Sequence, residues 1–184
     1  GLTVSFGRLK AVDTFSMTVE AGELRVVLGP NGAGKTTLMD LISGKTHSTA
    51  GAVYLFGENV TNLPEHQIAR AGVGRKFQIP SVFRDLTVDE NLRVACSTDR
   101  SVWKNLRLRS DSEETRKREE VIETADLGVI LDTRAGDLSH GQMQWLELGM
   151  LMGQGARLLL LDEPTAGMTQ GETQLTAEII NRMR

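Results

Sequence analysis

Hydrophobic and polar positions along this 184-residue chain follow two different periods. In the first third of the chain, and again near residue 160, short alternating or continuous apolar runs predict strands. From about residue 80 to 154, apolar positions recur at helical spacing, which predicts a mainly helical segment. The simplest fold with this order of elements is an α/β fold, in which a helical insert interrupts a parallel core.

Five stretches have the composition of strands. Residues 2–6 and 15–19 alternate between apolar and polar side chains, as half-buried strands do. Residues 24–28 form a continuous apolar run rich in β-branched side chains, which predicts a buried strand. Further strands are expected at 51–56 and at 157–161, and the second of these is again apolar enough to be buried.

Helix boundaries are indicated by capping signals. Thr87 and Glu90 have the spacing of a capping box, and Ser139 is a typical N-cap ahead of an apolar run. Pro64 is compatible with the first turn of a short helix. The charged face of the 113–127 segment is interpreted as a solvated helix surface rather than a binding site. The expected helices cover residues 35–43, 64–70, 113–127, 139–153 and 172–184.

Composition removes several classes of protein from consideration. The net charge of −3 gives no general attraction to nucleic acid, and the single Cys96 excludes a disulfide framework and fits a reducing compartment. No apolar run approaches the roughly 18–20 residues that cross a bilayer. Because the chain starts at Gly1 without Met and stops at Arg184 within a helical pattern, we expect a trimmed or partial domain.

Residues 29–36 match the phosphate-loop pattern G-x-x-x-x-G-K-[ST] between a predicted strand and a predicted helix. Glycines in this loop let backbone N–H groups point inward at the positive end of the helix, which suits the phosphates of ATP. A glycine-rich turn arising by chance is the alternative, and the strand and helix on either side argue against it. Residues of this loop expected to contact the nucleotide are Asn31, Gly32, Ala33, Gly34, Lys35 (β- and γ-phosphates), Thr36 (Mg²⁺) and Thr37 (α-phosphate).

Asp162 and Glu163 follow directly after the apolar run 158–161. Alone, two acids after a strand would be an ordinary solvent-facing strand end. In a chain with a phosphate loop, they are the carboxylates that phosphoryl transfer needs, Asp162 beside the metal and Glu163 polarising the attacking water.

A second anion-seeking helix start lies at residues 138–142, with the sequence LSHGQ. Ser139 and Gly141 stand at the N-terminus of the predicted helix, where the helix dipole favours negative charge. Because the first loop already surrounds the phosphates of one ATP, this second start suggests contact with a second molecule's nucleotide.

Four motifs occur in the order GPNGAGKTT, Phe77-Gln78, LSHGQ and LLLLDEP, and together they resemble the nucleotide-binding subunit of ATP-binding-cassette (ABC) transporters. The resemblance covers essentially the whole chain. It implies a P-loop NTPase core with an antiparallel β-subdomain at residues 1–79 and 155–184, and an inserted α-helical subdomain at 80–154. It also implies that two such chains close head to tail, so that each ATP lies between one phosphate loop and the other chain's LSHGQ segment.

The resemblance also assigns roles to individual residues. Gln78 would sense Mg²⁺ and the attacking water and link the site to a membrane partner, whereas without the family it would be an ordinary surface residue. Phe6 resembles the aromatic residue that stacks on adenine, although taken alone it is more typical of a core residue. The implied catalytic residues are Glu163 and Gln78; the implied metal ligands are Thr36, Gln78 and Asp162; and Ser139, Gly141 and Gln142 would contact the partner's nucleotide.

Within the family, residues 71–78 and 166–168 resemble importers of the branched-chain amino acid type, and residues 139–151 resemble urea-importer ATPases. The implied partners are a second ABC ATPase subunit, membrane permease subunits and, indirectly, a solute-binding protein, with no nucleic acid. The implied location is cytoplasmic, at the inner face of the membrane. Candidate residues for the permease dock are Gln78, Ile79, Pro80, Val82 and Phe83, which would otherwise pack inside the insert. The alternative function is a soluble ABC-family ATPase that is not coupled to transport.

The chain departs from the family pattern in three respects. His140 replaces a usual glycine, and its side chain either adds a donor near the partner's phosphates or turns away from them. Thr169 stands where many cassettes carry an aspartate, so communication between paired sites is expected to rest on other groups. The family's switch histidine lies further along than this chain extends, so we expect ATP binding with weak or undetectable hydrolysis.

Overall fold

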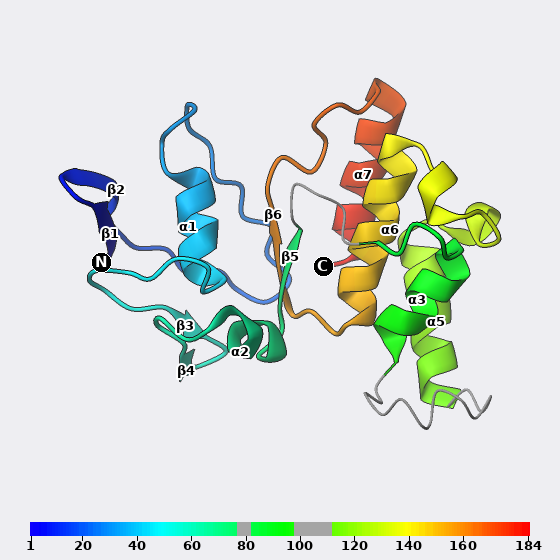
Figure 1. Cartoon of the computed structure of the whole chain (residues 1–184), viewed down its shortest axis with the longest axis horizontal. Helices are drawn as coiled ribbons and strands as arrows, with labels where there is room; N and C mark the ends of the chain where they lie inside the picture. Colours follow the sequence, from blue (N-terminus) through cyan, green and yellow to red (C-terminus); the bar gives the residue numbers. More distant parts are fainter. Residues whose placement is uncertain (77–81, 98–111) are drawn as a thin grey trace. The chain divides into compact units, whose positions relative to one another are not determined.

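A computed structural model of the chain describes residues 1–76, 82–97 and 112–184 (Figure 1). Two compact units are present, Gly1–Val73 together with Arg184, and Gly74–Met183. Each unit has its own cluster of buried hydrophobic side chains. The division predicted from the sequence, with a helical subdomain at 80–154, stays a prediction.

The first unit is built on an antiparallel strand pair. Its core consists of side chains from the two strands and from the helix that follows them: Leu2, Val4, Val12, Leu38 and Leu41. The strands predicted at 2–6 and the helix predicted at 35–43 are therefore confirmed. The elements of this unit are β1 (Leu2–Phe6), β2 (Leu9–Phe15), α1 (Lys35–Ile42), an antiparallel pair of β3 (Tyr54–Leu55) and β4 (Glu58–Asn59), and α2 (Glu65–Arg70).

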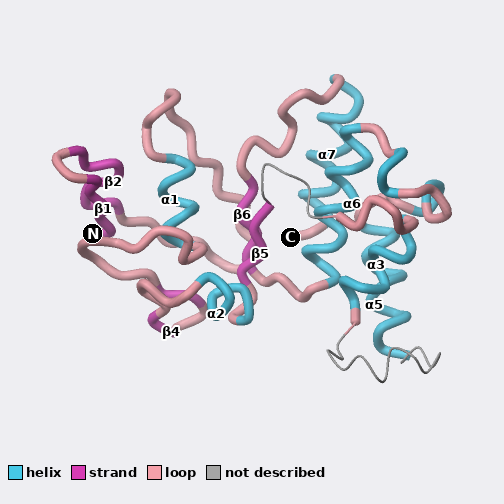
Figure 2. The backbone as a smooth tube through the Cα atoms, in the orientation of Figure 1, coloured by secondary structure: helices cyan, strands magenta, loops and turns pink. Residues whose placement is uncertain are grey.

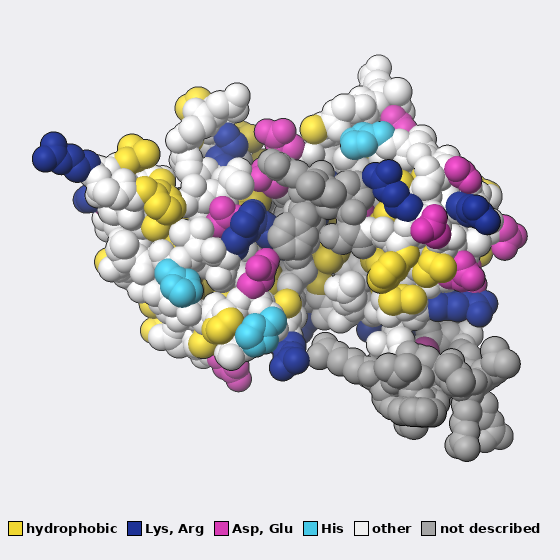
Figure 3. All heavy atoms as spheres, viewed as in Figure 1, with side chains coloured by type: hydrophobic (Ala, Val, Ile, Leu, Met, Phe, Trp, Pro, Cys, Tyr) yellow, Lys and Arg dark blue, Asp and Glu magenta, His cyan; other side chains and the backbone are white. Residues whose placement is uncertain are grey.

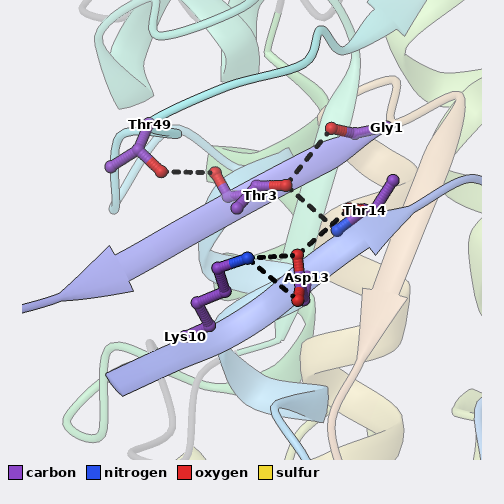
Figure 4. A network of polar contacts seen from close by, with 6 residues as sticks. All are labelled: Gly1, Thr3, Lys10, Asp13, Thr14 and Thr49. Carbon is purple, nitrogen blue, oxygen red and sulfur yellow. Dashed lines mark hydrogen bonds and ion pairs between the residues drawn. The ribbon is translucent and has the colours of Figure 1, made fainter. Parts of the chain in front are cut away.

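The pairing of β1 with β2 is irregular, and side chains supply part of the hydrogen bonding (Figure 4). Thr3 Oγ1 accepts the Thr14 N–H at 3.0 Å, and the Thr3 carbonyl accepts the Thr49 hydroxyl at 3.2 Å. Thr14 has a φ of +51°, where a regular ladder breaks, and its hydroxyl bonds the Asp13 carboxylate, which also receives Lys10. These contacts fix the register where two shifts interrupt the ladder.

Two strand predictions in this unit are wrong. No strand covers residues 15–19; the strand in this part of the chain is β2, which lies earlier and ends at Phe15. Residues 24–28 form no strand, and Leu24, Val26 and Leu28 are 48%, 65% and 88% exposed. Their apolar composition indicates a preference for burial, but a strand also needs neighbouring strands to bond, and none of the strands in the described part of the chain pairs with them. The strand expected at 51–56 shortens to β3.

The second unit combines the β5–β6 strand pair with a group of helices (Figure 2). The helices predicted around 88, 113–127, 139–153 and 172–184 are all present. Its elements are β5, which spans Val73–Lys76 and so begins at the last residue of the first unit, α3 (Val88–Cys96), α5 (Ser112–Thr124), the 3₁₀ turns Gly128–Ile130 and Ala135–Asp137, α6 (His140–Gly153), β6 (Leu158–Leu161) and α7 (Gln170–Arg182).

Helix α6 lies at the centre of this second core. It is apolar on nearly all sides, as expected for a helix surrounded by others, and Leu146 and Leu148 are almost completely buried. Gly153 allows close packing, because a Cβ there would lie 2.9 Å from Cys96 Sγ of α3. Burial of that thiol raises the pKa of Cys96, which leaves it inert at neutral pH.

Asn91 of α3 is fully buried and holds the segment that precedes its own helix. Its side chain accepts the Phe83 N–H at 2.8 Å and donates to the carbonyls of Phe83 and Thr87 at 3.0 and 2.9 Å. Phe83 is 52% exposed, whereas Val82 packs partly against the helical core. Of the predicted dock residues, Gln78, Ile79 and Pro80 lie outside the described residues.

In the described ranges, no helix combines the length and apolarity that a bilayer crossing requires.

Candidate functional site

The phosphate loop ends in a glycine that the backbone requires. Gly34 is the N-cap of α1 and has a φ of +85°, in the left-handed region that glycine adopts freely. A Cβ at this position would lie 2.3 Å from the Ala11 carbonyl oxygen in β2. Strand β2 therefore presses against the loop from behind and sets the position at which α1 begins.

Lys35 folds back over its own loop. Its ammonium group donates to the carbonyl oxygens of Gly29 at 2.7 Å and Pro30 at 2.9 Å. The first turn of α1 contains no acidic side chain, and its N-cap glycine offers no side-chain acceptor to the backbone N–H groups. A cation and uncapped N–H groups at a helix N-terminus form a donor set that fits a polyphosphate.

The other predicted contacts in this unit are accessible. Asn31, Gly32, Ala33 and Thr36 are exposed, and Thr37 is half-buried. Phe6 is 54% exposed at the end of β1, so it is not a core residue, and its ring is available for stacking.

Asp162 and Glu163 follow β6 in the second unit, as the sequence predicts. Glu163 has a φ of +46°, a conformation that costs a residue with a Cβ roughly 1–2 kcal/mol. The Ala166 N–H donates to the Glu163 carbonyl at 3.1 Å and closes the turn.

The segment 138–142 forms the start of α6, as predicted. Ser139 is the N-cap, and its hydroxyl accepts the Gln142 N–H at 3.2 Å. The Gln142 side chain returns to the Ser139 N–H at 3.0 Å and completes a capping box. In this arrangement the Gln142 amide, which was predicted to contact nucleotide, is bonded to the backbone of its own helix.

The side chain of His140 turns toward its own chain. Its Nε2 lies 3.1 Å from the Ala166 carbonyl oxygen and 2.8 Å from the Gln144 side-chain amide. An Nε2–H that donates to Ala166 cannot also accept from an amide N–H. The Gln144 amide oxygen is buried without a hydrogen-bond partner. With the amide oxygen and nitrogen of Gln144 exchanged, that oxygen lies 2.8 Å from His140 Nε2 and can accept its proton. The His140 side chain thus contacts Ala166 and Gln144 of its own chain, and its position relative to a partner's phosphates stays a prediction.

The predicted site residues are divided between the two units. Residues 29–37 and Phe6 belong to the first unit, and Asp162, Glu163 and residues 138–142 belong to the second. Gln78 lies outside the described residues. Within residues 1–76, 82–97 and 112–184, no group of three or more His, Cys, Asp or Glu side chains is positioned to hold a metal. The Thr36 hydroxyl and the Asp162 carboxylate are oxygen donors of the kind Mg²⁺ prefers, with phosphate oxygens and water completing its shell.

Two features near α6 were missed in the sequence. Glu172 of α7 lies against the start of α6, and Lys76 at the end of β5 forms an ion pair with Glu147 of α6, in which both side chains are 7% exposed. The spacing Thr169-x-x-Glu172 is a capping box that the sequence offered as a signal. The ion pair carries no local signal, because its members are far apart along the chain.

On the face drawn in Figure 3, acidic and basic side chains of the described residues lie interspersed. No basic stripe of the kind that tracks a nucleic-acid backbone is visible among them on that face.

Comparison with known proteins gives consistent results. Residues 12–166 match the family model described as ABC transporter. The BraF protein of Pseudomonas aeruginosa, a high-affinity branched-chain amino acid transport ATP-binding protein, is 37% identical over 191 residues, covering 100% of this chain and 75% of its own. The LivG protein of Archaeoglobus fulgidus, a probable branched-chain amino acid transport ATP-binding protein, is 36% identical over 171 residues, covering 91% of this chain and 66% of its own.

Among solved structures, the ADP conformation of an ATP-binding cassette of an ABC transporter superposes with a TM-score of 0.82 at 30% identity. It covers 99% of this chain and 74% of its own. The chain thus spans between about two thirds and three quarters of the length of these relatives. The similarity confirms the predicted P-loop NTPase fold.

Proposed function

Since the chain belongs to the ABC transporter family, we propose that it is the ATPase subunit that powers an importer of branched-chain amino acids or a related small polar solute. Membership of the family makes it an ATP-binding protein. The observation that carries the proposal is the phosphate loop at α1, where β2 admits only glycine at position 34 and Lys35 is held over the loop.

In the proposed cycle, one nucleotide is held by two half-sites. The phosphate loop holds the triphosphate through Lys35 and the backbone N–H groups of α1. Thr36, Asp162 and Gln78 would hold Mg²⁺, which would supply charge neutralisation at the phosphates, and Glu163 would orient the attacking water. Ser139 and the start of α6 in a second copy would close over the same phosphates, so that binding drives dimerisation.

The importer type rests on the relatives. BraF and LivG are named as branched-chain amino acid transport ATP-binding proteins, and they align with 91% or more of this chain. Amides and urea stay among the candidate solutes because residues 139–151 resemble urea-importer ATPases, but the cassette itself does not select the solute. Permease subunits in the membrane would receive the motion of the dimer, and a solute-binding protein would deliver the solute to them.

The first test measures nucleotide binding. Lys35→Ala removes the ammonium group that faces the phosphates, so ATP affinity should fall at least about tenfold, the loss expected for one charge-assisted contact. Lys10→Ala removes an equally charged but exposed side chain of the same unit and should leave affinity unchanged. Equal affinities of the two variants would contradict the role of the loop.

The second test measures coupling. The chain should co-purify with permease subunits, and any ATP-dependent uptake of a branched-chain amino acid or urea into vesicles that contain these subunits and a solute-binding protein should require the chain. Glu163→Gln should abolish uptake while ATP binding remains. Hydrolysis that no permease stimulates, together with failure to associate with one, would favour the soluble ABC ATPase instead.

A further inference from the structure

A carboxylate of the chain itself occupies the start of α6. The Ser139 hydroxyl donates to Glu172 Oε1 at 3.4 Å. A Cβ on Gly141 would lie 2.5 Å from the same oxygen and 2.8 Å from the carboxyl carbon. Glu172 therefore covers the backbone of Gly141 so closely that any side chain there would have to displace it.

Two helix N-termini converge on this one carboxylate. Its other oxygen, Oε2, accepts the Thr169 N–H and the Thr169 hydroxyl, both at 2.9 Å, at the start of α7. Helices α6 and α7 run side by side and both begin at the upper end of the view in Figure 1. About one turn further along both helices, the Trp145 indole donates to the Thr176 hydroxyl at 2.9 Å, so the two helices keep the same direction.

Glu172 is held in its charged form. Hydrogen bonds from the Thr169 backbone and hydroxyl, with smaller contributions from Ser139 and the Gly141 N–H, lower the pKa of Glu172 below its ordinary value. At neutral pH, the positive end of α6 thus already faces a full negative charge from α7.

We propose that Glu172 is an internal anion that holds the start of α6 until the phosphates of a second cassette's nucleotide displace it. The inference rests on the proposed function, because it requires a nucleotide at Ser139 and Gly141. The same hydroxyl and N–H groups cannot serve both anions, and a carboxylate beside a phosphate repels it. Glu172 thereby raises the ATP concentration that dimerisation requires and keeps cassettes without ATP apart.

The test compares ATP-driven dimerisation of variants that share Glu163→Gln, which prevents loss of ATP. Glu172→Gln keeps the capping box, since glutamine serves at this position, but removes the charge. The ATP concentration for half-maximal dimerisation, measured by light scattering, should fall roughly 2- to 5-fold, the value of one charge at a helix terminus. Glu178→Gln is the matched control, because it neutralises an exposed glutamate of the same helix away from α6.

A second measurement examines the contact without a dimer. In the wild-type chain free of nucleotide, the NMR chemical shift of the Gly141 amide should change at acidic pH as the Glu172 carboxylate is protonated. This change should be absent in Glu172→Gln. A Gly141 resonance that does not titrate overturns the inference. The inference about Glu172 is overturned if all variants reach half-maximal dimerisation at the same ATP concentration, or if Glu172→Gln requires a higher one. Either result leaves the proposed function intact. If no variant dimerises at any ATP concentration, both the inference about Glu172 and the proposed ATP-driven dimerisation are contradicted.

Discussion

At residue 34 the backbone leaves no room for a side chain. Gly34→Ala would place a Cβ 2.3 Å from the Ala11 carbonyl oxygen, in addition to the cost of a left-handed φ. Gly22→Ala is the matched control, since Gly22 has a φ of +74° with nothing within 4 Å. Both variants should lose roughly 1–2 kcal/mol of unfolding free energy from the φ alone. Gly34→Ala should lose more and should also bind ATP at least about tenfold less tightly, because β2 and α1 must separate.

Urea denaturation and a fluorescent ATP analogue measure the two effects of these glycine variants. Equal behaviour of Gly22→Ala and Gly34→Ala would show that the contact with Ala11 has no role. The requirement for glycine at position 34 was visible in the motif, but the strand that presses on it was not. The sequence specifies local φ preferences and says little about which distant segment passes behind a loop.

At the scale of elements, β5 and α6 are joined by the ion pair between Lys76 and Glu147, both 7% exposed and 4.0 Å apart. Lys76→Met leaves the Glu147 carboxylate buried without its lysine and should cost about 3–5 kcal/mol of unfolding free energy. Lys76→Met with Glu147→Met should recover most of this loss, since two apolar side chains replace a desolvated pair. The comparison variant, Lys10→Met, removes a lysine from an exposed ion pair and should leave the denaturation midpoint almost unchanged.

If the double variant has no higher unfolding free energy than Lys76→Met alone, apolar packing cannot replace the ion pair. Neither partner was identified in the sequence, where they are 71 residues apart.

Elements defined by local signals were predicted well. The capping box predicted at Thr87 and the N-cap predicted at Ser139 correctly mark the starts of α3 and α6, because a cap depends on a few consecutive residues. The apolar run 24–28 was mistaken for a strand, because strand formation depends on partners elsewhere. The candidate site followed the same rule: its loop and helix starts were found in the sequence, whereas Glu172 and the orientation of His140 required tertiary structure.

At the scale of the whole molecule, three carboxylates among the described residues have lowered pKa values and make stability depend on pH. The pKa of Asp13 is lowered mainly by its hydrogen bond from Lys10, that of Glu23 by the Glu20 N–H, and that of Glu172 by the Thr169 N–H. A pKa that is lower in the folded state stabilises the protein above the unfolded value and loses that contribution as pH falls through the folded value. Unfolding free energy should therefore be steady near neutral pH and fall once the pH drops below the ordinary glutamate value of 4.5.

Urea denaturation at pH 7, 5, 4 and 3.5 measures this dependence. Glu172→Gln should flatten the acid slope of the unfolding free energy, since it removes one of these groups. Stability that rises on acidification would contradict the assignment.

Because of the left-handed backbone at Glu163, a substitution that stabilises the fold at this position would abolish the proposed hydrolysis. Glycine adopts a φ of +46° without the steric cost that a Cβ carries, so Glu163→Gly relaxes the turn after β6. The same exchange deletes the carboxylate that the proposed hydrolysis needs. A screen that selects for thermal stability alone would therefore enrich inactive variants at position 163. Variants of higher stability should be selected with their ATP hydrolysis rate measured in parallel.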